Sequence, residues 1–336
     1  MIRPLILAAA LVACVLPAHA QQKVAIRSGL PWASGAGGYS GGMEELEAMR
    51  GRPLDVRVLF LPIDRWSNMI AGAKHAGTHA RTGARISIGI GMLPEESRGQ
   101  HMACWQQRFA HHIRAIGAGL INNGAPDAII RLGWEANRPN GYPWAVVKGK
   151  EREYIGCFRK WVNQLRSLAG QRFVIDWTMQ DKSGFPASAI YPGGAWVDLI
   201  GINVYDRCPP IRDDAAWTQW IYRKHGDGWN PRGPATWLEF ATTRGKKLSI
   251  PEWGIGGAQT VKYCSEPGFD NAWWVRKWHG WLSANAGHIA YESAANFHGD
   301  GQPNDRSPTK GGSHRLAPST WNPQSAKAYK ELWGAP

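Results

Sequence analysis

Two glutamates stand directly after strand-like runs of the chain. Glu135 follows residues 129–134, and Glu252 follows Leu248–Pro251. Two carboxyl groups held about 5 Å apart cleave a glycosidic bond when one attacks the anomeric carbon and the other protonates the leaving oxygen. That reaction retains the anomeric configuration, and it needs one acid that keeps its proton and one that stays ionised. The plainer interpretation of each glutamate is an ordinary acid at the start of a loop.

Two neighbouring side chains offer a means of making the carboxyl groups unequal. Arg131 lies four residues before Glu135, and we expect it to point into the same site and stabilise negative charge. Tyr205 ends another strand-like run, and we expect its hydroxyl to hydrogen-bond Glu252. A structural ion pair is the alternative for Arg131, so we assign it to binding or support and not to catalysis.

The chain alternates strand-like runs with helical patterns, in eight repeats of one unit. The predicted strands are residues 24–26, 56–60, 86–90, 128–132, 173–177, 199–204, 248–250 and 289–291, and the helical patterns include 43–49, 102–120, 154–168, 237–243, 272–284 and 324–332. The Gly- and Pro-rich stretches 29–42 and 300–318 are expected to be loops. This alternation predicts an α/β protein, a (β/α)8 TIM barrel in a single domain. A doubly wound open sheet, with fewer strands, is the alternative.

In such barrels the active site forms at the carboxyl ends of the strands. Glu135 would follow the fourth strand and Glu252 the seventh, and these two strands face each other across the mouth of the barrel. We therefore expect both carboxyl groups in one cleft.

Aromatic residues also follow the predicted strands. They are Trp66, Trp134, Tyr142, Trp144, Trp177 and Trp253. Flat rings pack against the C–H face of a sugar, so this set favours a carbohydrate ligand over a small charged metabolite. Core packing is the alternative for each ring; it is favoured for Trp144, whereas ligand contact is favoured for Trp177 and Trp253.

The first twenty residues have the features of a secretory signal. Arg3 precedes an apolar run over 5–17, and the small-residue ending 18–20 is typical of a cleavage site. We expect a signal peptide over 1–20, a catalytic barrel over 21–336, and a secreted or periplasmic protein. A lipoprotein box at 11–14, with a lipid on Cys14, is the alternative. No later apolar run approaches the roughly 20 residues of a membrane span.

Four cysteines remain after residue 20. They are Cys104, Cys157, Cys208 and Cys264. An oxidising compartment and the lack of a close Cys-x-x-Cys spacing favour disulfides over a metal site. The barrel places the first two in consecutive outer helices and the last two in loops after the sixth and seventh strands. Of the three pairings that four cysteines permit, this placement favours the bridges 104–157 and 208–264. We expect no metal, no cofactor and a monomer.

The formal net charge of +13 raises the question of an anionic partner. Export argues against nucleic acid, as does the lack of a phosphate-binding glycine loop or a clustered metal-ligand motif. Four basic residues fall in loops after the fourth to sixth predicted strands, where an acidic sugar would meet them: Arg138, Lys182, Arg207 and Arg212. A basic surface without a ligand is the plainer interpretation.

Three motifs in order along the chain resemble glycoside hydrolase family 26. Residues 131–137 read Arg-Leu-Gly-Trp-Glu-Ala-Asn and 141–144 read Gly-Tyr-Pro-Trp, where the family has Arg-x-x-His-Glu-x-Asn and Trp-Tyr-Pro-Trp. Residues 197–205 are similar to the family's sixth-strand Val-Asp-x-x-Gly-x-x-x-Tyr, and 250–254 to its seventh-strand x-x-Glu-Phe-Gly. Trp134 replaces the family's histidine, and one extra residue precedes Tyr142, which indicates a divergent member.

The resemblance implies a clan A (β/α)8 barrel that hydrolyses β-linked polysaccharides such as mannan, xylan or mixed-linkage glucan with retention. It implies that Glu135 is the acid/base and Glu252 the nucleophile, without a cofactor, and it places Asn137 and Asn203 among the substrate-binding residues. The replacement at Trp134 puts mannan itself in doubt as the substrate.

Two other classes of function stay open. One is a noncatalytic carbohydrate-binding barrel, which keeps the groove but not the catalytic geometry. The other is a lyase acting on an anionic exopolysaccharide, which needs a base beside a neutralised carboxylate and would recruit basic residues and His298. The identity of the sugar, endo or exo action, and a degradative or biosynthetic role are also open.

Overall fold

Eight parallel strands pair in chain order, and the last pairs with the first, so that they close a barrel. The strands are β1 (Ser34–Gly37), β2 (Val56–Phe60), β3 (Arg85–Ile90), β4 (Ile129–Leu132), β5 (Val174–Gln180), β6 (Leu199–Tyr205), β7 (Lys247–Gly254) and β8 (Ile289–Ala295). The structure is a computed structural model that describes residues 24–38, 41–138, 141–181, 185–206, 209–255, 270–296, 314–320 and 322–336. The predicted (β/α)8 barrel is confirmed, and the open sheet is excluded.

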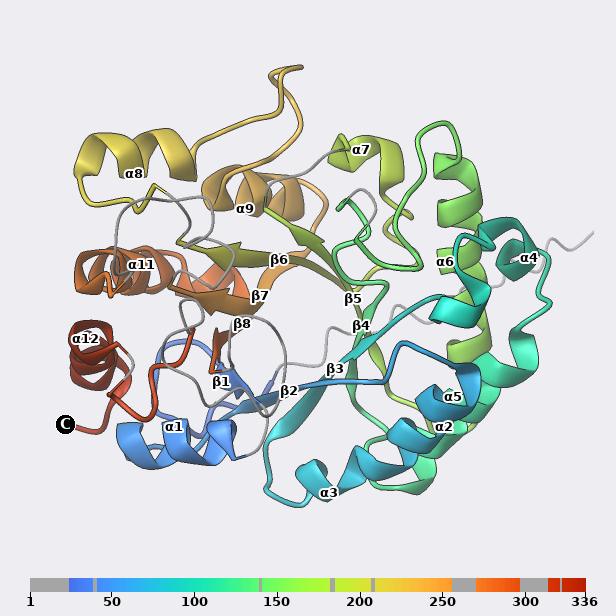
Figure 1. Cartoon of the computed structure of the whole chain (residues 1–336), viewed down its shortest axis with the longest axis horizontal. Coiled ribbons are helices and arrows are strands. Elements are labelled where there is room, and N and C mark those ends of the chain that lie inside the picture. Colours follow the sequence, from blue (N-terminus) through green and yellow to red (C-terminus); the bar gives the residue numbers. More distant parts are fainter. Residues whose placement is uncertain are drawn as a thin grey trace, which may run out of the picture.

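Helices surround the strands on the outside (Figure 1). They are α1 (Gly42–Arg50), α2 (Trp66–His75), α3 (Gly77–Ala80), α4 (His101–Trp105), α5 (Ala110–Asn122), α6 (Glu151–Arg166), α7 (Ala187–Ile190), α8 (Asp214–Ile221), α9 (Pro234–Thr242), α11 (Ala272–Ala284) and α12 (Pro323–Trp333), with short 3-10 turns at Glu95–Ser97 and Ala286–His288. The pattern over 102–120 is two helices, because the chain breaks after α4 and Gln107 takes a positive φ of 65°. None of the helices in the described ranges is long and apolar enough to cross a membrane.

The first strand differs from the prediction. The apolar run 24–26 forms no strand, and β1 lies inside the stretch that was expected to be a loop. The reason is space: a Cβ on Gly35 would lie 2.4 Å from the carbonyl oxygen of Val56. This strand therefore needs small residues and lacks the β-branched residues by which strands are usually recognised.

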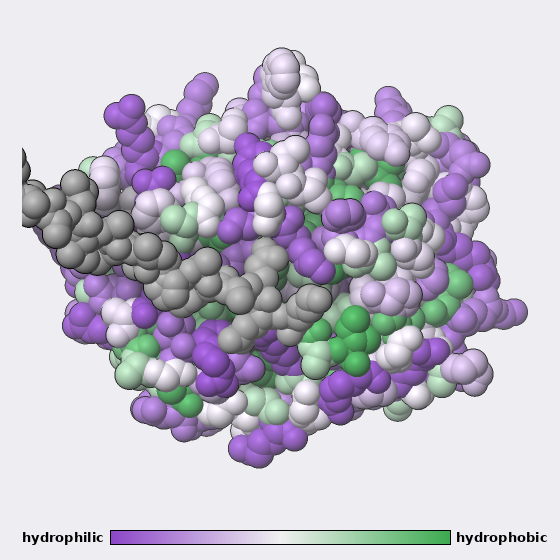
Figure 2. Space-filling view, turned by 180° about the vertical axis from the view of Figure 1, so that it is seen from behind, coloured by the Kyte–Doolittle hydropathy of each residue, from purple (hydrophilic) through white to green (hydrophobic). Residues whose placement is uncertain are grey.

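Two apolar clusters hold the layers together. The larger one fills the space between strands and helices and contains most of the buried tryptophans. The smaller one consists of residues near the amino ends of the strands: Ala33, Val56, Val58, Ile129, Val174, Leu199 and Tyr291. The surface seen from behind is mainly hydrophilic with scattered apolar patches (Figure 2). The smaller cluster fills the barrel at the amino ends of the strands, and the polar residues of the interior lie nearer the carboxyl ends.

A polar layer lies between the smaller apolar cluster and the mouth of the barrel, at the carboxyl ends of the strands. Asp176 is fully buried and accepts hydrogen bonds from Ser249 Oγ at 2.7 Å and from the hydroxyl of Tyr291 at 2.9 Å. Burial raises the pKa of Asp176, although these hydrogen bonds and the charge of Arg131 oppose the shift. This polar layer separates the apolar cluster from the residues of the mouth.

Candidate active site

The strand ends bring Glu135 and Glu252 into one mouth. Glu252 lies two residues before the carboxyl end of β7, and Glu135 follows the end of β4. Asn203 of β6 donates from Nδ2 to Oε1 of both carboxylates, at 2.9 Å in each case. Since both oxygens lie that close to one nitrogen, they are within about 6 Å of each other, which suits a retaining pair and not the wider inverting one.

Three donors converge on Glu252. Besides Asn203, the hydroxyl of Tyr205 donates to Oε2 at 2.9 Å, and the fully buried Arg131 forms an ion pair with Oε1. Burial alone would lower the pKa of Arg131, but the negative charge of Glu252 raises it overall. The two contacts expected for Glu252 are therefore present in the structure, and they hold its carboxylate in one orientation.

Arg131 also sets the direction of the Asn203 amide. Its Nη2 donates to Asn203 Oδ1 at 3.1 Å, so the amide nitrogen has to face the two carboxylates. Phe60 of β2 lies under the guanidinium, whose carbon is 5.2 Å from the ring centroid. The cation is thus locked between an aromatic ring and polar partners.

A strained turn presents Glu135. Its φ of 53° lies in the left-handed region, and Gly133 two residues before has a φ of 58°. The backbone nitrogen of Glu135 donates to the carbonyl oxygen of Thr178 on β5 at 2.9 Å, which fixes the turn. A side chain other than glycine pays about 1 to 2 kcal/mol for this conformation, and such outliers cluster at functional sites.

Asn137 braces the same turn. Its Nδ2 donates to the carbonyl oxygen of Gln180 at 2.8 Å, and its Oδ1 accepts from the backbone nitrogen of Gln180 at 2.9 Å. The side chain is fully buried. Both polar atoms are thus occupied by β5, so Asn137 holds the Glu135 turn in place and does not offer its amide to a ligand.

An aromatic wall borders the carboxylates. Tyr142 stacks on Trp144, with ring centroids 4.7 Å apart and planes at 1°, and Trp134 contacts both rings. Burial raises the pKa of Tyr142, and the charges of Glu135 and Glu252 raise it further. The Tyr142 ring is therefore close to both acids. The Trp134 side chain is only 4% exposed.

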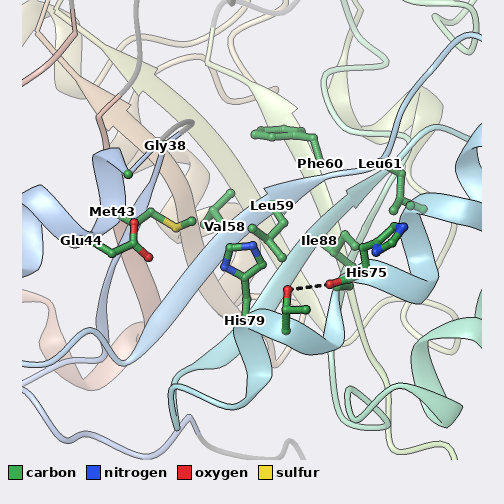
Figure 3. Close-up of a pocket in the computed structure, with 14 residues that line it drawn as sticks. Gly38, Met43, Glu44, Val58, Leu59, Phe60, Leu61, His75, His79 and Ile88 are labelled. Atoms are coloured by element: carbon green, nitrogen blue, oxygen red, sulfur yellow. Dashed lines mark hydrogen bonds between the residues drawn. The ribbon is translucent and has the colours of Figure 1, made fainter. Parts of the chain in front are cut away.

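Phe60 also belongs to this wall, although it lies outside the motifs that predict the site. Its ring lies 5.3 Å from that of Trp134, and it also lines a cavity of about 350 Å³ beside β2. In Figure 3 it stands at the upper edge of this cavity, with His79 and Glu44 on the opposite side. The available signal was an aromatic residue at the end of a predicted strand. His314, whose ring lies 4.6 Å from that of Tyr205, was missed as well, and it follows a stretch without any strand signal.

Trp177 and Trp253 do not face a ligand, so that prediction is wrong. Both are fully buried. Trp177 donates to the hydroxyl of Tyr154 on α6 at 3.1 Å, and Trp253 packs against α11 and α12. Successive side chains of a strand point to opposite faces. Because Glu252 points into the mouth, its neighbour Trp253 has to point outward to the helices.

Trp66 and Trp144 are also packing residues. Trp66 begins α2, is 4% exposed and stacks on His112, with ring centroids 5.0 Å apart. Trp144 is fully buried, and its indole nitrogen donates to the carbonyl oxygen of Trp134 at 2.9 Å. Core packing, the favoured interpretation of Trp144, is correct, and the ligand contact expected for Trp66 is wrong.

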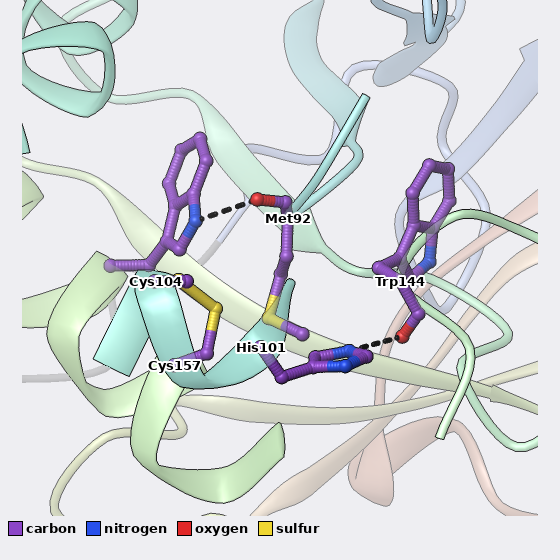
Figure 4. The surroundings of a disulfide bond; sticks show 6 residues. Met92, His101, Cys104, Trp144 and Cys157 are labelled. Carbon is purple, nitrogen blue, oxygen red and sulfur yellow. Dashed lines mark hydrogen bonds between the residues drawn. A yellow bond between two sulfur atoms is a disulfide. The ribbon is translucent and has the colours of Figure 1, made fainter. Parts of the chain in front are cut away.

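A disulfide lies next to the loop that carries Tyr142 and Trp144. Cys104 of α4 and Cys157 of α6 are bonded, with Cα atoms 5.1 Å apart, which confirms the first predicted bridge. Figure 4 shows His101 of α4 beside this bond, with its ring pointing to the carbonyl oxygen of Trp144 at 3.1 Å. Cys208 and Cys264 lie outside the described residues, as do Lys182, Arg207, His298 and the whole of 1–20, so the predictions about them stay predictions.

The fold and the mouth define a class of protein: a (β/α)8 barrel with paired carboxylates from β4 and β7. In the ranges that the structure describes, no three His, Cys, Asp or Glu side chains are grouped as for a metal ion. No protein-family model matches the chain, and no curated protein matches it.

Solved structures do match the fold. The chain is similar to the catalytic domain of the family 26 endo-β-1,4-mannanase from Bacillus sp. JAMB-750, with 16% identity, a TM-score of 0.60 and coverage of 92% of this chain and 88% of that one. It is also similar to the Bacillus subtilis mannanase BCman (13%, 0.57, 90% and 86%) and to a family 26 β-mannanase from Bacteroides ovatus (14%, 0.55, 90% and 88%). At these identities the likeness establishes the fold.

Proposed function

We propose that this protein is a retaining glycoside hydrolase that cleaves a β-linked polysaccharide. The observation that supports it best is the amide of Asn203, which bonds both Glu135 and Glu252 at 2.9 Å and so spaces them for a double displacement. The similar solved proteins are named as mannanases, which agrees with this class of reaction.

The residues of the mouth divide the reaction between them. Glu252 attacks the anomeric carbon, and the bond to the leaving sugar breaks as Glu135 gives its proton to that oxygen. In the second step Glu135 takes a proton from water, and the water oxygen replaces Glu252 on the anomeric carbon. Arg131 and Tyr205 hold Glu252 in line for the attack. The chemistry is complete with these side chains.

The substrate is a β-glycan, and the site departs from that of a standard mannanase. Trp134 stands where the family has histidine, directly before the acid/base, and it packs against Phe60 and Tyr142. An indole in this place offers a larger apolar surface than an imidazole, and one N–H in place of two ring nitrogens. We infer that the enzyme accepts a sugar other than mannose at the cleaved bond, in a xylan, a glucan or an exopolysaccharide.

An acidic exopolysaccharide is the second candidate substrate, and one cation near the mouth favours it. Arg138 lies close enough to Tyr142 for its charge to lower the pKa of the phenol, against the stronger effect of burial. Cleavage of an acidic polymer should weaken as salt rises, whereas that of a neutral glucan should not. An equal response of both polymers to salt would remove this candidate.

Product analysis with a panel of purified β-glycans tests the proposal. We expect saturated oligosaccharides with new reducing ends from at least one polymer, and none from the variant Glu252→Gln, which controls for contaminants. An unsaturated, ultraviolet-absorbing chain end would instead identify a lyase. Binding of a polymer without any product would identify a noncatalytic barrel.

The residues expected to be a signal peptide support a secreted or periplasmic site of action. Comparing the mass of the exported protein with that of the full chain checks cleavage after residue 20, and a lipid on Cys14 would add the mass of its acyl chains. We propose that the exported enzyme is a monomer, which sedimentation analysis tests.

A further inference from the structure

The hairpin between α8 and α9 carries an aromatic ring that the proposed active site does not use. Of the large hydrophobic side chains in the described ranges, Trp229 is the most exposed, at 86%, and Tyr222 at the foot of the same hairpin is 64% exposed. In Figure 1 this yellow loop extends away from the body of the molecule. A solvent-exposed indole is a ready contact for an apolar face.

The hairpin is a formed structure. Asp227 accepts hydrogen bonds from the backbone nitrogens of Trp229 and Asn230, both at 2.9 Å, and from the Asn230 side chain at 2.8 Å. These bonds lower the pKa of Asp227 to about 2, so the tip keeps its charged cap in ordinary conditions. The backbones of Lys224 and Pro231 pair as an isolated antiparallel β-bridge across the hairpin. Because the backbone of Trp229 is fixed in this way, stacking of a ligand has to order only the torsions of its side chain.

The hairpin belongs to the same end of the barrel as the carboxylates. It leads directly into α9, which runs back along the barrel to the start of β7, so the amino end of α9 lies at the carboxyl end of the strands. Asn230 also accepts a hydrogen bond from the backbone nitrogen of Ser188 on α7 at 2.8 Å, which ties the hairpin to the segment after β5. Trp229 is therefore fixed relative to the mouth.

The tip has free space around it. Within the described part of the chain, no heavy atom beyond the adjacent residues lies within 4 Å of the position that a Cβ would take on Gly226 or Gly228, the glycines on both sides of Asp227. The ring of Trp229 thus stands where an extended polymer is able to lie across it. We propose that this hairpin is a second carbohydrate-binding site, on which Trp229 stacks against the C–H face of a sugar unit distant from the cleaved bond. This inference rests on the proposed function, because the ligand is the same β-glycan chain.

Such a site acts through local concentration. A long polymer that is held by Trp229 presents its remaining units to the mouth, so its binding exceeds that of a short fragment unable to span both places. A single stacked ring contributes about 0.5 to 1.5 kcal/mol, which corresponds to roughly a 2- to 10-fold change in affinity. The hairpin should therefore distinguish long from short substrates.

The test measures binding of a polymer to the inactive variant Glu252→Gln, with and without a second change. We expect Trp229→Ala to weaken retention in a gel containing the polymer that the panel identifies by about 2- to 10-fold, and Trp229→Phe to restore most of it. Trp105→Ala is the matched control, because Trp105 is 39% exposed on the outer helix α4. Thermal unfolding checks that each variant is folded.

Each outcome decides a separate point. In the active enzyme, Trp229→Ala should lower kcat/KM for the polymer more than for a short oligosaccharide. Equal binding by Trp229→Ala and its parent overturns the inference, and so does a Trp229-dependent self-association or vesicle binding in the absence of glycan. If the wild type cleaves no glycan while the inactive variant still loses affinity with Trp229→Ala, the hydrolase proposal fails and the hairpin site stands.

Discussion

Glu252 and Glu292 lie on neighbouring strands, and both carboxylates are buried, but they face opposite sides of the barrel wall. Glu252 is 7% exposed at the mouth and receives hydrogen bonds from Arg131, Asn203 and Tyr205. Glu292 is fully buried among the helices and receives hydrogen bonds from indole nitrogens, Trp32 at 3.2 Å, Trp333 at 3.0 Å and the closer Trp253. A buried, well-bonded carboxylate is therefore not a mark of an active site by itself.

The difference between the two acids lies in their neighbours. Glu252 has a cation and a second carboxylate, Glu135, which Asn203 links to it. Glu292 has neutral donors, and burial raises its pKa although Ser34 and the three indoles oppose the shift. The proposed nucleophile Glu252 is thus partly open to the mouth and paired with a cation, whereas Glu292 is surrounded by indole rings.

The largest expected difference in activity is between the variants in which Glu252 or Glu292 is replaced by glutamine. We expect Glu252→Gln to lower kcat/KM by at least about 1,000-fold, because an amide is not a nucleophile, while Glu292→Gln keeps its activity within about 10-fold. Initial rates of reducing-end release measure both. If Glu292→Gln were as inactive as Glu252→Gln in a folded protein, the distinction between the two acids would be lost.

Glu135, the proposed acid/base, comes next in expected effect. Glu135→Gln should lower kcat/KM on a polysaccharide by about 100- to 10,000-fold, the range for general acid–base catalysis. An aryl glycoside whose leaving group needs no proton should lose much less in the first step. A uniform loss on both substrates, measured by the release of the phenol and of reducing ends, would argue against a proton-donor role.

Tyr205 sharpens the comparison because its hydroxyl donates directly to the Glu252 carboxylate. Tyr205→Phe removes a bond to a charged group, which contributes about 1.5 to 3 kcal/mol, so a loss of roughly 10- to 150-fold is expected in kcat/KM. Trp333→Phe removes the corresponding bond to Glu292 and should change the melting temperature more than the rate. Steady-state kinetics and thermal unfolding of both variants measure the contrast.

Glu292 should make the stability of the folded protein depend on pH. Its pKa in the folded protein lies above the ordinary value of 4.5. Its contribution to the free energy of unfolding is therefore full below that pH and is lost as the pH rises toward the raised pKa. The melting temperature of the wild type should therefore fall relative to that of Glu292→Gln as the pH increases above 4.5. Parallel curves between pH values of about 4 and 8 would contradict this assignment.

The mouth was largely predictable from the sequence. The rule that functional side chains follow barrel strands selected Glu135 and Glu252, and it anticipated that Arg131 and Tyr205 point toward them. The same rule failed for Trp177 and Trp253. It finds the end of a strand but not the face, and strand alternation assigns the residue next to an inward acid to the outside.

The outer network was not predictable, because its members lie far apart in the chain. Glu292 is bonded by tryptophans before β1, in β7 and in α12, and no local pattern brings these together. The first strand was missed for a related reason. Gly35 is required by its close approach to Val56 of β2, a neighbour that only the closed barrel supplies.

The configuration of the first product tests directly whether Glu135 and Glu252 work as a retaining pair. Proton NMR during the first minutes of cleavage follows the new reducing ends before they mutarotate. A retaining pair releases the β anomer first, and the α anomer follows only at the rate of mutarotation. Immediate appearance of the α anomer would show inversion, and with it that a water stands between the two carboxylates instead of a covalent bond to Glu252.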